Sequence, residues 1–288
     1  MIKLIRFLYQ GKVRLGLQAE DKVIGLSEIG QFSPNISLVK LATDFYDELR
    51  RIAATDDAEK LSYKLSDLQL LPPVDANGKI IGAAVNYHSA CAIGGSKLPK
   101  SPVLFAKYSH TLIGQGQAVT LPMKSQQITY EGELAIVIGR EATMVDPARA
   151  HQYIAGITAA NDISASDLIR EDSNFFRGKN FNGFLPLGPS FIPVQEVPNL
   201  NDLPISTEID GIERQRSSTG DMIFSCASLI SYISQIFTLH PGDVILTGTP
   251  AGVAAHHTPA AWLQDGQTVS VRIGSFLQLT NPVMRTEP

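Results

Sequence analysis

The chain has 288 residues, of which 44% are apolar and 18% are charged, a balance typical of a folded globular protein that excludes a largely disordered chain. A formal net charge of −4 without a block of Lys or Arg argues against nucleic acid or an anionic membrane as a partner. The two cysteines make no disulfide framework, charge interrupts the N-terminus too early for a secretory signal, and no apolar stretch approaches the roughly 18 residues of a membrane span, so we expect a cytoplasmic protein.

The N-terminal part of the chain predicts a small β-rich unit. Residues 1–32 alternate apolar and polar side chains around a Gln-Gly-Lys turn, which predicts a hairpin. Apolar residues at helical spacing over 37–58 predict a helix that closes the unit. The Leu-Leu-Pro-Pro run at 70–73 is a stiff connector, because proline fixes its own φ and restricts the preceding residue. We therefore expect a small N-terminal domain at 1–72 and a larger domain at 73–288.

Strands dominate the larger domain. Apolar runs predict extended segments at 79–85, 102–107, 130–139, 154–160 and 244–246. Residues 86–97 are small and rich in glycine, which favours a mobile lid over a site. Residues 221–237 place apolar side chains on one helical face and predict a long amphipathic helix that packs on the sheet. The fold class that follows is α+β and mostly β.

Two carboxylates lie at the start of the predicted strand 130–139. Because side chains alternate along a strand, Glu131 and Glu133 face the same way. Asp162 follows the buried run 154–160 and places a third carboxylate at the end of that strand. Carboxylates this close repel one another, so a cation between them removes the cost of burying them unpaired. Three oxygen ligands without Cys or His suit a hard divalent ion, Mg²⁺, Mn²⁺ or Ca²⁺, rather than zinc.

A set of motifs, in the right order over roughly residues 79–280, resembles the motifs of the fumarylacetoacetate hydrolase family. The matching segments are 130–135 (YExELA), 161–165 (NDxSA), 178–181 (GKxF), 186–189 (PLGP) and 241–253 (PGDVIxTGTPxGV). The resemblance implies a mixed β-sandwich roll, usually a homodimer, preceded by a smaller N-terminal domain. It also implies Mg²⁺ or Mn²⁺ bound by the two glutamates and the aspartate named above.

The same resemblance assigns roles to residues around the metal. The family's conserved lysine falls on Lys179, and a second basic position falls on Lys107. The threonine that contacts the substrate carboxylate falls on Thr249. We expect the histidines His110, His256 and His257 to be structural or exposed.

The segment after Asn-Tyr departs from the hydrolytic members of the family. Those members carry a histidine and a glutamate that activate water, but here the two positions hold Ala90 and Ile93. His88 is a candidate replacement, since an unperturbed imidazole pKa near 6.5 suits a general base; an ordinary polar loop residue is the alternative. Tyr87 beside it is a candidate substrate contact, and Arg170 stands near the place of the arginine that usually follows NDxSA.

Three functions remain open from the sequence. Family resemblance favours a metal-dependent hydrolase that cleaves a C–C bond in a 1,3-dicarbonyl or acylpyruvate-like 2-oxo acid through a metal-stabilised enolate, as in the catabolism of aromatic compounds. The missing water-activating pair favours an isomerase, a tautomerase or an oxaloacetate-type decarboxylase on the same scaffold. The third is a catalytically silent protein that binds a 2-oxo acid, and the intact acidic residues argue against it. Resemblance of fold does not by itself fix a reaction.

Overall fold

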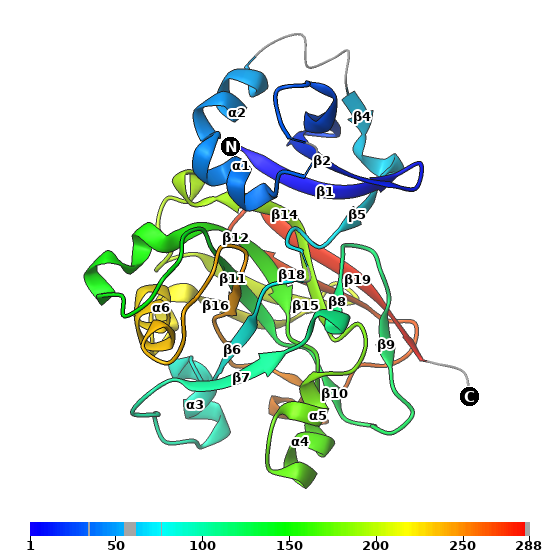
Figure 1. Cartoon of the computed structure of the whole chain (residues 1–288). Helices are drawn as coiled ribbons and strands as arrows, with labels where there is room; N and C mark the ends of the chain where they lie inside the picture. Colours follow the sequence, from blue (N-terminus) through cyan, green and yellow to red (C-terminus); the bar gives the residue numbers. More distant parts are fainter. Residues whose placement is uncertain (34, 55–61, 76, 286–288) are drawn as a thin grey trace.

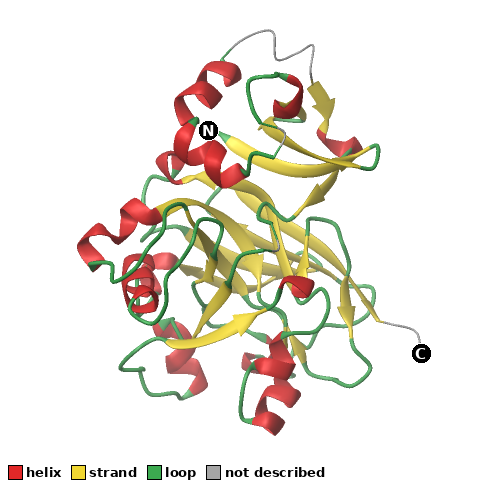
Figure 2. Cartoon of the chain, viewed as in Figure 1, coloured by secondary structure: helices red, strands yellow, loops and turns green. Residues whose placement is uncertain are grey.

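The computed structural model describes residues 1–33, 35–54, 62–75 and 77–285. Two β-sheets pack face to face, and a smaller unit built from the N-terminal residues lies at one end of the sandwich (Figure 1). Strands outweigh helices along the chain, and the helices lie around the outside of the sheets (Figure 2). The prediction of an α+β, mostly β fold is confirmed.

The N-terminal unit is an antiparallel sheet with two helices. Its strands are β1 (Lys3–Tyr9), β2 (Lys12–Ala19), β3 (Lys22–Gly25), β4 (Ser62–Lys64) and β5 (Gln69–Leu71). β1 and β2 form the predicted hairpin, paired from Lys3↔Gln18 to Tyr9↔Lys12. β1 also pairs with β14 of the large sheet at Leu4↔Phe191, so the N-terminal strands continue that sheet. The domain boundary after residue 72 stays a prediction.

The single helix expected over 37–58 is wrong, because the structure has two helices there. α1 (Leu38–Asp44) begins at Ser37, whose hydroxyl accepts the N–H of Lys40, and α2 (Tyr46–Ala53) follows after one residue. That residue, Phe45, has φ −125° and ψ 20°, outside the helical region, and its ring packs edge-on against Phe32. Burial of this ring against the N-terminal unit outweighs continuation of the helix. The expected end near residue 58 lies outside the described residues.

The large sheet carries the strands that form the site. Beyond the N-terminal strands its order is β14-β12-β11-β17-β6-β7, and β8 pairs with β14. The bounds are β6 (Ile80–Ala84), β7 (Val103–Lys107), β8 (Leu112–Ile113), β11 (Gly132–Ile138), β12 (Ile154–Asn161), β14 (Leu185–Pro193) and β17 (Val244–Leu246). All seven residues of β11 and all eight of β12 are buried, so these central strands are covered on both faces.

The second sheet covers one face of the first. Its strands are, in spatial order, β16 (Ile212–Ser218), β15 (Pro204–Ile209), β18 (Thr268–Ile273), β19 (Leu277–Arg285) and β9 (Val119–Leu121). A two-stranded ribbon, β10 (Ile128–Thr129) with β13 (Ser164–Ala165), lies beside the site. Leu134, Ile136 and Ile138 of β11 pack with Val271 and Ile273 of β18 in one apolar core. This core fixes which face of β11 turns away from the carboxylates.

Helix α6 (Cys226–Ser234) packs against this core and is shorter than the helix predicted over 221–237. It begins where the hydroxyl of Ser225 accepts the N–H of Ser228, and the residues just before it form a tight turn at 219–221. Further 3₁₀-helical segments lie at 26–28, 65–67, 109–111, 147–153, 194–196 and 254–256.

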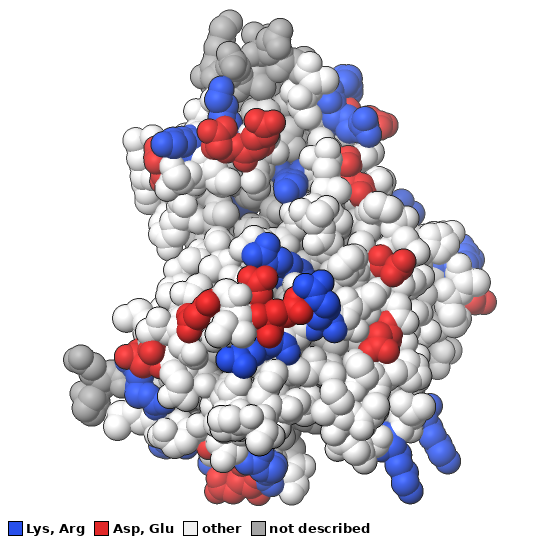
Figure 3. All heavy atoms as spheres, turned by 180° about the vertical axis from the view of Figure 1, so that it is seen from behind, with Lys and Arg blue, Asp and Glu red and all other residues white. Residues whose placement is uncertain are grey.

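Three short helices lie at the end of the large sheet where the carboxylates are found. They are α3 (His88–Gly94), α4 (Ser166–Asp172) and α5 (Phe176–Lys179). The glycine-rich segment predicted as a lid is thus partly helical, and α3 ends at Gly95, whose φ is +65°. Among the described residues no helix is long and apolar enough to cross a membrane. Basic and acidic side chains lie next to one another on the face seen in Figure 3, so no field of one sign covers that face.

Candidate metal centre and substrate cavity

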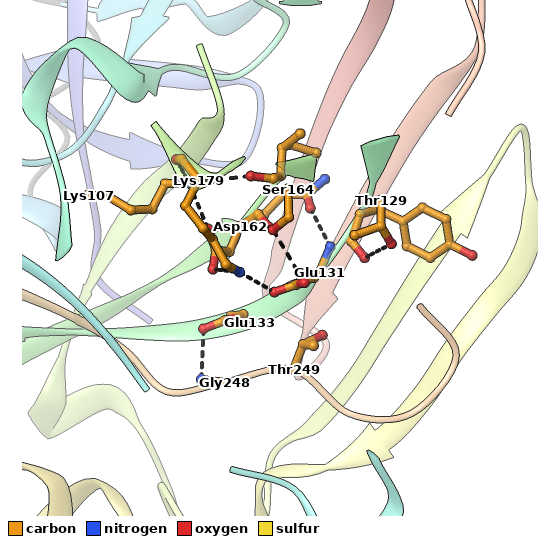
Figure 4. Close-up of polar contacts among 12 residues, drawn as sticks. Lys107, Thr129, Glu131, Glu133, Asp162, Ser164, Lys179, Gly248 and Thr249 are labelled. Atoms are coloured by element: carbon orange, nitrogen blue, oxygen red, sulfur yellow. Dashed lines mark hydrogen bonds and ion pairs between the residues drawn. The ribbon is translucent and has the colours of Figure 1, made fainter. Parts of the chain in front are cut away.

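Three carboxylates meet where β11 begins and β12 ends. The two strands are antiparallel with Gly132 opposite Asn161, so the residues just beyond them, Glu131 and Asp162, lie side by side. The Asp162 N–H donates to the Glu131 carbonyl at 2.9 Å, and the Glu131 N–H donates to Oδ1 of Asn161 at 2.9 Å. Glu133, one alternation along β11, points into the same space (Figure 4). One carboxylate oxygen from each of the three residues lies within 4.8 Å of those from the other two.

Two lysines from other parts of the chain reach this group. Lys179 Nζ lies 2.7 Å from Glu131 Oε2 and 2.5 Å from Asp162 Oδ2 (Figure 4). The same ammonium lies 4.7 Å from the centre of the Phe105 ring. Lys107 Nζ lies 2.7 Å from Asp162 Oδ1 and donates to the Lys179 carbonyl at 2.5 Å. Both lysines are 3% exposed. The structure therefore gathers five of the residues expected at the site.

Burial and charge shift the pKa values of these groups in different directions. Burial raises the pKa of Glu133 well above its ordinary value, and the nearby Asp162 carboxylate adds to the rise. Burial also raises the pKa of Glu131, against the attraction of Lys179. Burial acts upward on Asp162 as well, but Lys107 and Lys179 outweigh it and lower the pKa of that carboxyl. Burial lowers the pKa of Lys107, whereas at Lys179 the three carboxylates outweigh burial and raise the pKa.

The donor set fits a hard divalent cation. Three buried or half-buried carboxylates face two ammonium groups, which leaves one negative charge without a partner when all five residues are ionised. Burial and the neighbouring Asp162 carboxylate raise the pKa of Glu133, and a proton on Glu133 would restore neutrality. A Mg²⁺ or Mn²⁺ ion held by Glu131, Glu133 and Asp162 would replace that proton and leave one net positive charge, which suits an anionic substrate.

The loop after β17 supports Glu133 from the other side. The Gly248 N–H donates to Glu133 Oε2 at 2.7 Å (Figure 4). The Thr249 hydroxyl donates to the Gly132 carbonyl at 2.9 Å and accepts from Gln215 Nε2 at 2.8 Å. This hydroxyl is thus engaged on both sides, and it holds the loop against β11.

Gly248 is a position where the backbone requires glycine. Its φ is +92°, and a Cβ there would lie 2.8 Å from Asn86 Cβ and 2.9 Å from the Ala83 carbonyl oxygen. We expect Gly248→Ala to lower the free energy of unfolding by about 1–3 kcal/mol and to weaken Mn²⁺ binding, because the N–H is displaced from Glu133. Gly211→Ala is the matched control, since Gly211 has φ +76° and open space around it. Equal Mn²⁺ affinities of the two variants by calorimetry would contradict this account.

A cavity of about 230 Å³ opens directly onto the carboxylates. Glu131, Glu133, Lys179 and Thr249 line it, with Ile169 and Phe175 as part of its apolar wall. Drug-sized ligands occupy pockets of roughly 300–1,000 Å³, so this cavity suits a smaller molecule. A larger hollow of about 810 Å³ lies near Lys3, Ser190 and Arg272, but no carboxylate lines it. The chemistry therefore places the site at the smaller cavity.

Helix α3 contributes no titratable side chain to the cavity. Its lining residues are Ala90 and Gly94, while the His88 side chain is exposed and is not among the lining residues. Tyr87 is fully buried next to α3, and burial raises the pKa of its phenol. Arg170 is exposed on α4 and donates to the Gln127 side chain. The structure thus brings none of His88, Tyr87 and Arg170 to the cavity wall.

The sequence did not single out a histidine that does line the cavity. His256, in the turn at 254–256, lies on the wall that also contains Val253 and Pro250. Its Nδ1 accepts the Gly252 N–H at 3.0 Å. The available signal was its place in the loop that follows Thr249, but spacing alone does not tell which loop residue turns inward.

Comparisons with known proteins agree with this geometry. Residues 79–284 match the family described as fumarylacetoacetate (FAA) hydrolase C-terminal. The mitochondrial oxaloacetate tautomerase Fahd2a of Rattus norvegicus is 34% identical over 220 residues, which cover 76% of this chain and 70% of that protein. A structure of 2-hydroxyhepta-2,4-diene-1,7-dioate isomerase from Mycobacterium marinum is similar with a TM-score of 0.78 at 30% identity, and the match covers 100% of both chains.

A third similar protein carries a metal. It is the maleylpyruvate hydrolase from Sphingobium sp. SYK-6, solved with manganese (II) ion and pyruvate, with a TM-score of 0.81 at 25% identity over 99% of this chain and 100% of that chain. The names tautomerase and isomerase among these proteins favour the second function expected from the sequence over the first, C–C hydrolysis. With the family match spanning most of the chain and the acidic group at its centre, the chain belongs to the fumarylacetoacetate hydrolase family of enzymes.

Proposed function

We propose that the protein is a metal-dependent tautomerase or isomerase of a small 2-oxo acid, of the oxaloacetate type. The observation that carries this proposal is the cavity itself: Glu131, Glu133 and Lys179 line it, and the residues that α3 adds to its wall offer no side chain able to activate water. The names of the tautomerase and isomerase relatives support it. The small volume of the cavity, about 230 Å³, supports a substrate of a few carbon atoms.

The residues at the site have two roles: the carboxylates would hold a cation, and the lysines balance negative charge. Glu131, Glu133 and Asp162 would hold Mg²⁺ or Mn²⁺, which supplies Lewis-acid stabilisation of negative charge on the substrate's 2-oxo oxygen. Lys179 is kept protonated by its carboxylate neighbours, so it acts as a hydrogen-bond donor toward developing negative charge and not as a base. Lys107 lies behind Asp162 and holds that carboxylate in its ionised form.

Interconversion of keto and enol forms needs less from the protein than hydrolysis does. Both reactions pass through an enolate, but hydrolysis also requires a group that deprotonates water next to the carbonyl. Ala90 and Gly94 cannot do this from α3, and His256 has its Nδ1 lone pair engaged by Gly252. An enolate that forms in this cavity is therefore protonated, on carbon to give the keto form or on oxygen to give the enol, and these side chains supply no activated water to divert it.

Product analysis with the Mn²⁺-loaded protein tests this proposal. We expect the enol of oxaloacetate to lose its ultraviolet absorbance faster with the enzyme than without it, and we expect chelation of the metal to remove the difference. Acetylpyruvate offered in parallel should stay intact by NMR. Acetate and pyruvate from acetylpyruvate would identify a hydrolase, and pyruvate with CO₂ as the sole enzymatic products of oxaloacetate would identify a decarboxylase; either result would overturn the proposal.

A further inference from the structure

His256 stands apart from the other charged or titratable groups of the cavity. Among the described residues that line it, Glu131, Glu133 and Lys179 belong to the charged cluster, and His256 is the remaining titratable side chain. In the part of the chain that the structure describes, no carboxylate pairs with this imidazole. A Cβ built on Gly94 of α3 would lie 3.9 Å from His256 Nε2, so this nitrogen faces the helix that closes the cavity.

Backbone contacts fix the ring and its proton. Nδ1 accepts the Gly252 N–H at 3.0 Å, so the proton of the neutral imidazole resides on Nε2. Nε2 of the adjacent His257 donates to the Gly252 carbonyl at 2.9 Å, so both peptide groups that flank the Gly252 Cα are held. Only glycine fits at position 252, since its φ is +101° and a Cβ there would lie 2.1 Å from the Arg214 carbonyl oxygen. The loop thus presents one N–H donor to the cavity in a set direction.

The rest of the wall around this donor offers little other polarity. Ala90 and Gly94 of α3 and Val253 of the loop are apolar, and Ser96 adds one hydroxyl. If the 2-oxo acid end of a substrate is held at Glu131, Glu133 and Asp162, its other end has the rest of this cavity wall, which includes His256, to contact. An oxygen there gains a hydrogen bond in a partly desolvated place, where such bonds count most.

We propose that His256 is a substrate-binding residue that donates its Nε2–H to the carboxylate at the far end of a dicarboxylic 2-oxo acid. A neutral imidazole in a fixed tautomer is a suitable donor to substrate oxygen. The residue thereby selects dicarboxylic over monocarboxylic 2-oxo acids. This inference rests on the proposed function for the metal-binding end of the substrate, and it adds the group that recognises the other end.

Two substitutions separate substrate binding from loop structure. In His256→Asn, Oδ1 takes the place of Nδ1 and keeps an acceptor for Gly252, but the distal donor is lost. In His256→Gln, Nε2 keeps a donor near the cavity, while the acceptor for Gly252 is lost. A hydrogen bond to a charged group is worth roughly 10–100-fold in affinity, so the asparagine variant should lose that factor and the glutamine variant should stay within about threefold of wild type.

Calorimetric titration of the Mn²⁺-loaded protein with L-malate and L-lactate tests the inference without any turnover. The two acids share a 2-hydroxy acid end, and malate adds the remote carboxylate. We expect wild type to prefer malate by roughly tenfold or more, His256→Asn to lose the preference with lactate affinity unchanged, and His151→Asn, an exposed histidine away from the cavity, to match wild type.

The outcomes distinguish this inference from the proposed reaction. If wild type shows no preference for malate, or if the asparagine variant retains it while the glutamine variant loses it, His256 has only a structural role and the inference fails. If the preference depends on His256 but oxaloacetate is not tautomerised, the reaction assignment fails and the binding role stands. In steady-state assays the same contact predicts a rise in KM for oxaloacetate that exceeds the fall in kcat for His256→Asn.

Discussion

Glu133→Gln and Asp162→Asn should have very different effects on the stability of the metal-free protein although both abolish metal binding. Burial already raises the pKa of Glu133, so a neutral amide there costs little, and we expect the free energy of unfolding to stay within about 1 kcal/mol of wild type or to rise. Asp162 is the partner of two buried lysines, Lys107 and Lys179, so its loss should cost about 3–5 kcal/mol.

Chemical denaturation with and without Mn²⁺ measures both effects. At a Mn²⁺ concentration 100 times its Kd, wild type should gain about 2.7 kcal/mol, and neither variant should gain anything. Glu20→Gln, a change of an exposed glutamate outside the site, is the matched control and should keep the full gain. A metal-free Glu133→Gln protein that is several kcal/mol less stable than wild type would show that Glu133 is ionised and paired, against the charge balance described above.

Local pattern was sufficient to predict the acidic group. Alternation along β11 places Glu131 and Glu133 on one side, and the ends of β11 and β12 meet because the strands are antiparallel and in register. These positions are predictable because the residues are close in the sequence or belong to one pair of strands. The helix break at Phe45 escaped prediction because it depends on a tertiary contact with the Phe32 ring. The later start of α6 is set by the local Ser225 cap, which the spacing of apolar residues over 221–237 does not reveal.

The positions of His88 and His256 show a second limit of the sequence. Both histidines lie in segments next to the cavity, and periodicity treats them alike. The direction of His256 is set by the Gly252 N–H and by the fixed conformation of that glycine, whereas His88 opens α3 on its exposed side. Side-chain direction in irregular segments depends on such individual backbone contacts, which the spacing of residue types does not encode.

Charge balance also explains why a lysine lies among prospective metal ligands. With a divalent ion present, the ammonium of Lys179 adds to the positive charge of the site and so opposes metal binding, while it favours the carboxylate and the developing negative charge of the substrate. Its contribution is therefore to catalysis at a cost in metal affinity. A residue that served only to order the carboxylates would do the reverse, because its loss would weaken the metal site.

Lys179→Met tests this division directly. We expect Mn²⁺ affinity to rise by roughly tenfold or more because repulsion is removed, while kcat for tautomerisation falls by about 10²–10³-fold because the donor is lost. The metal-free variant should be less stable by about 3 kcal/mol, since Glu131 loses its buried partner, and Mn²⁺ should restore most of that loss. Calorimetry, initial rates and denaturation measure the three quantities, with Lys124→Met, an exposed lysine, as the control. Weaker Mn²⁺ binding would make Lys179 a support for the carboxylates, and an unchanged kcat would remove it from the reaction.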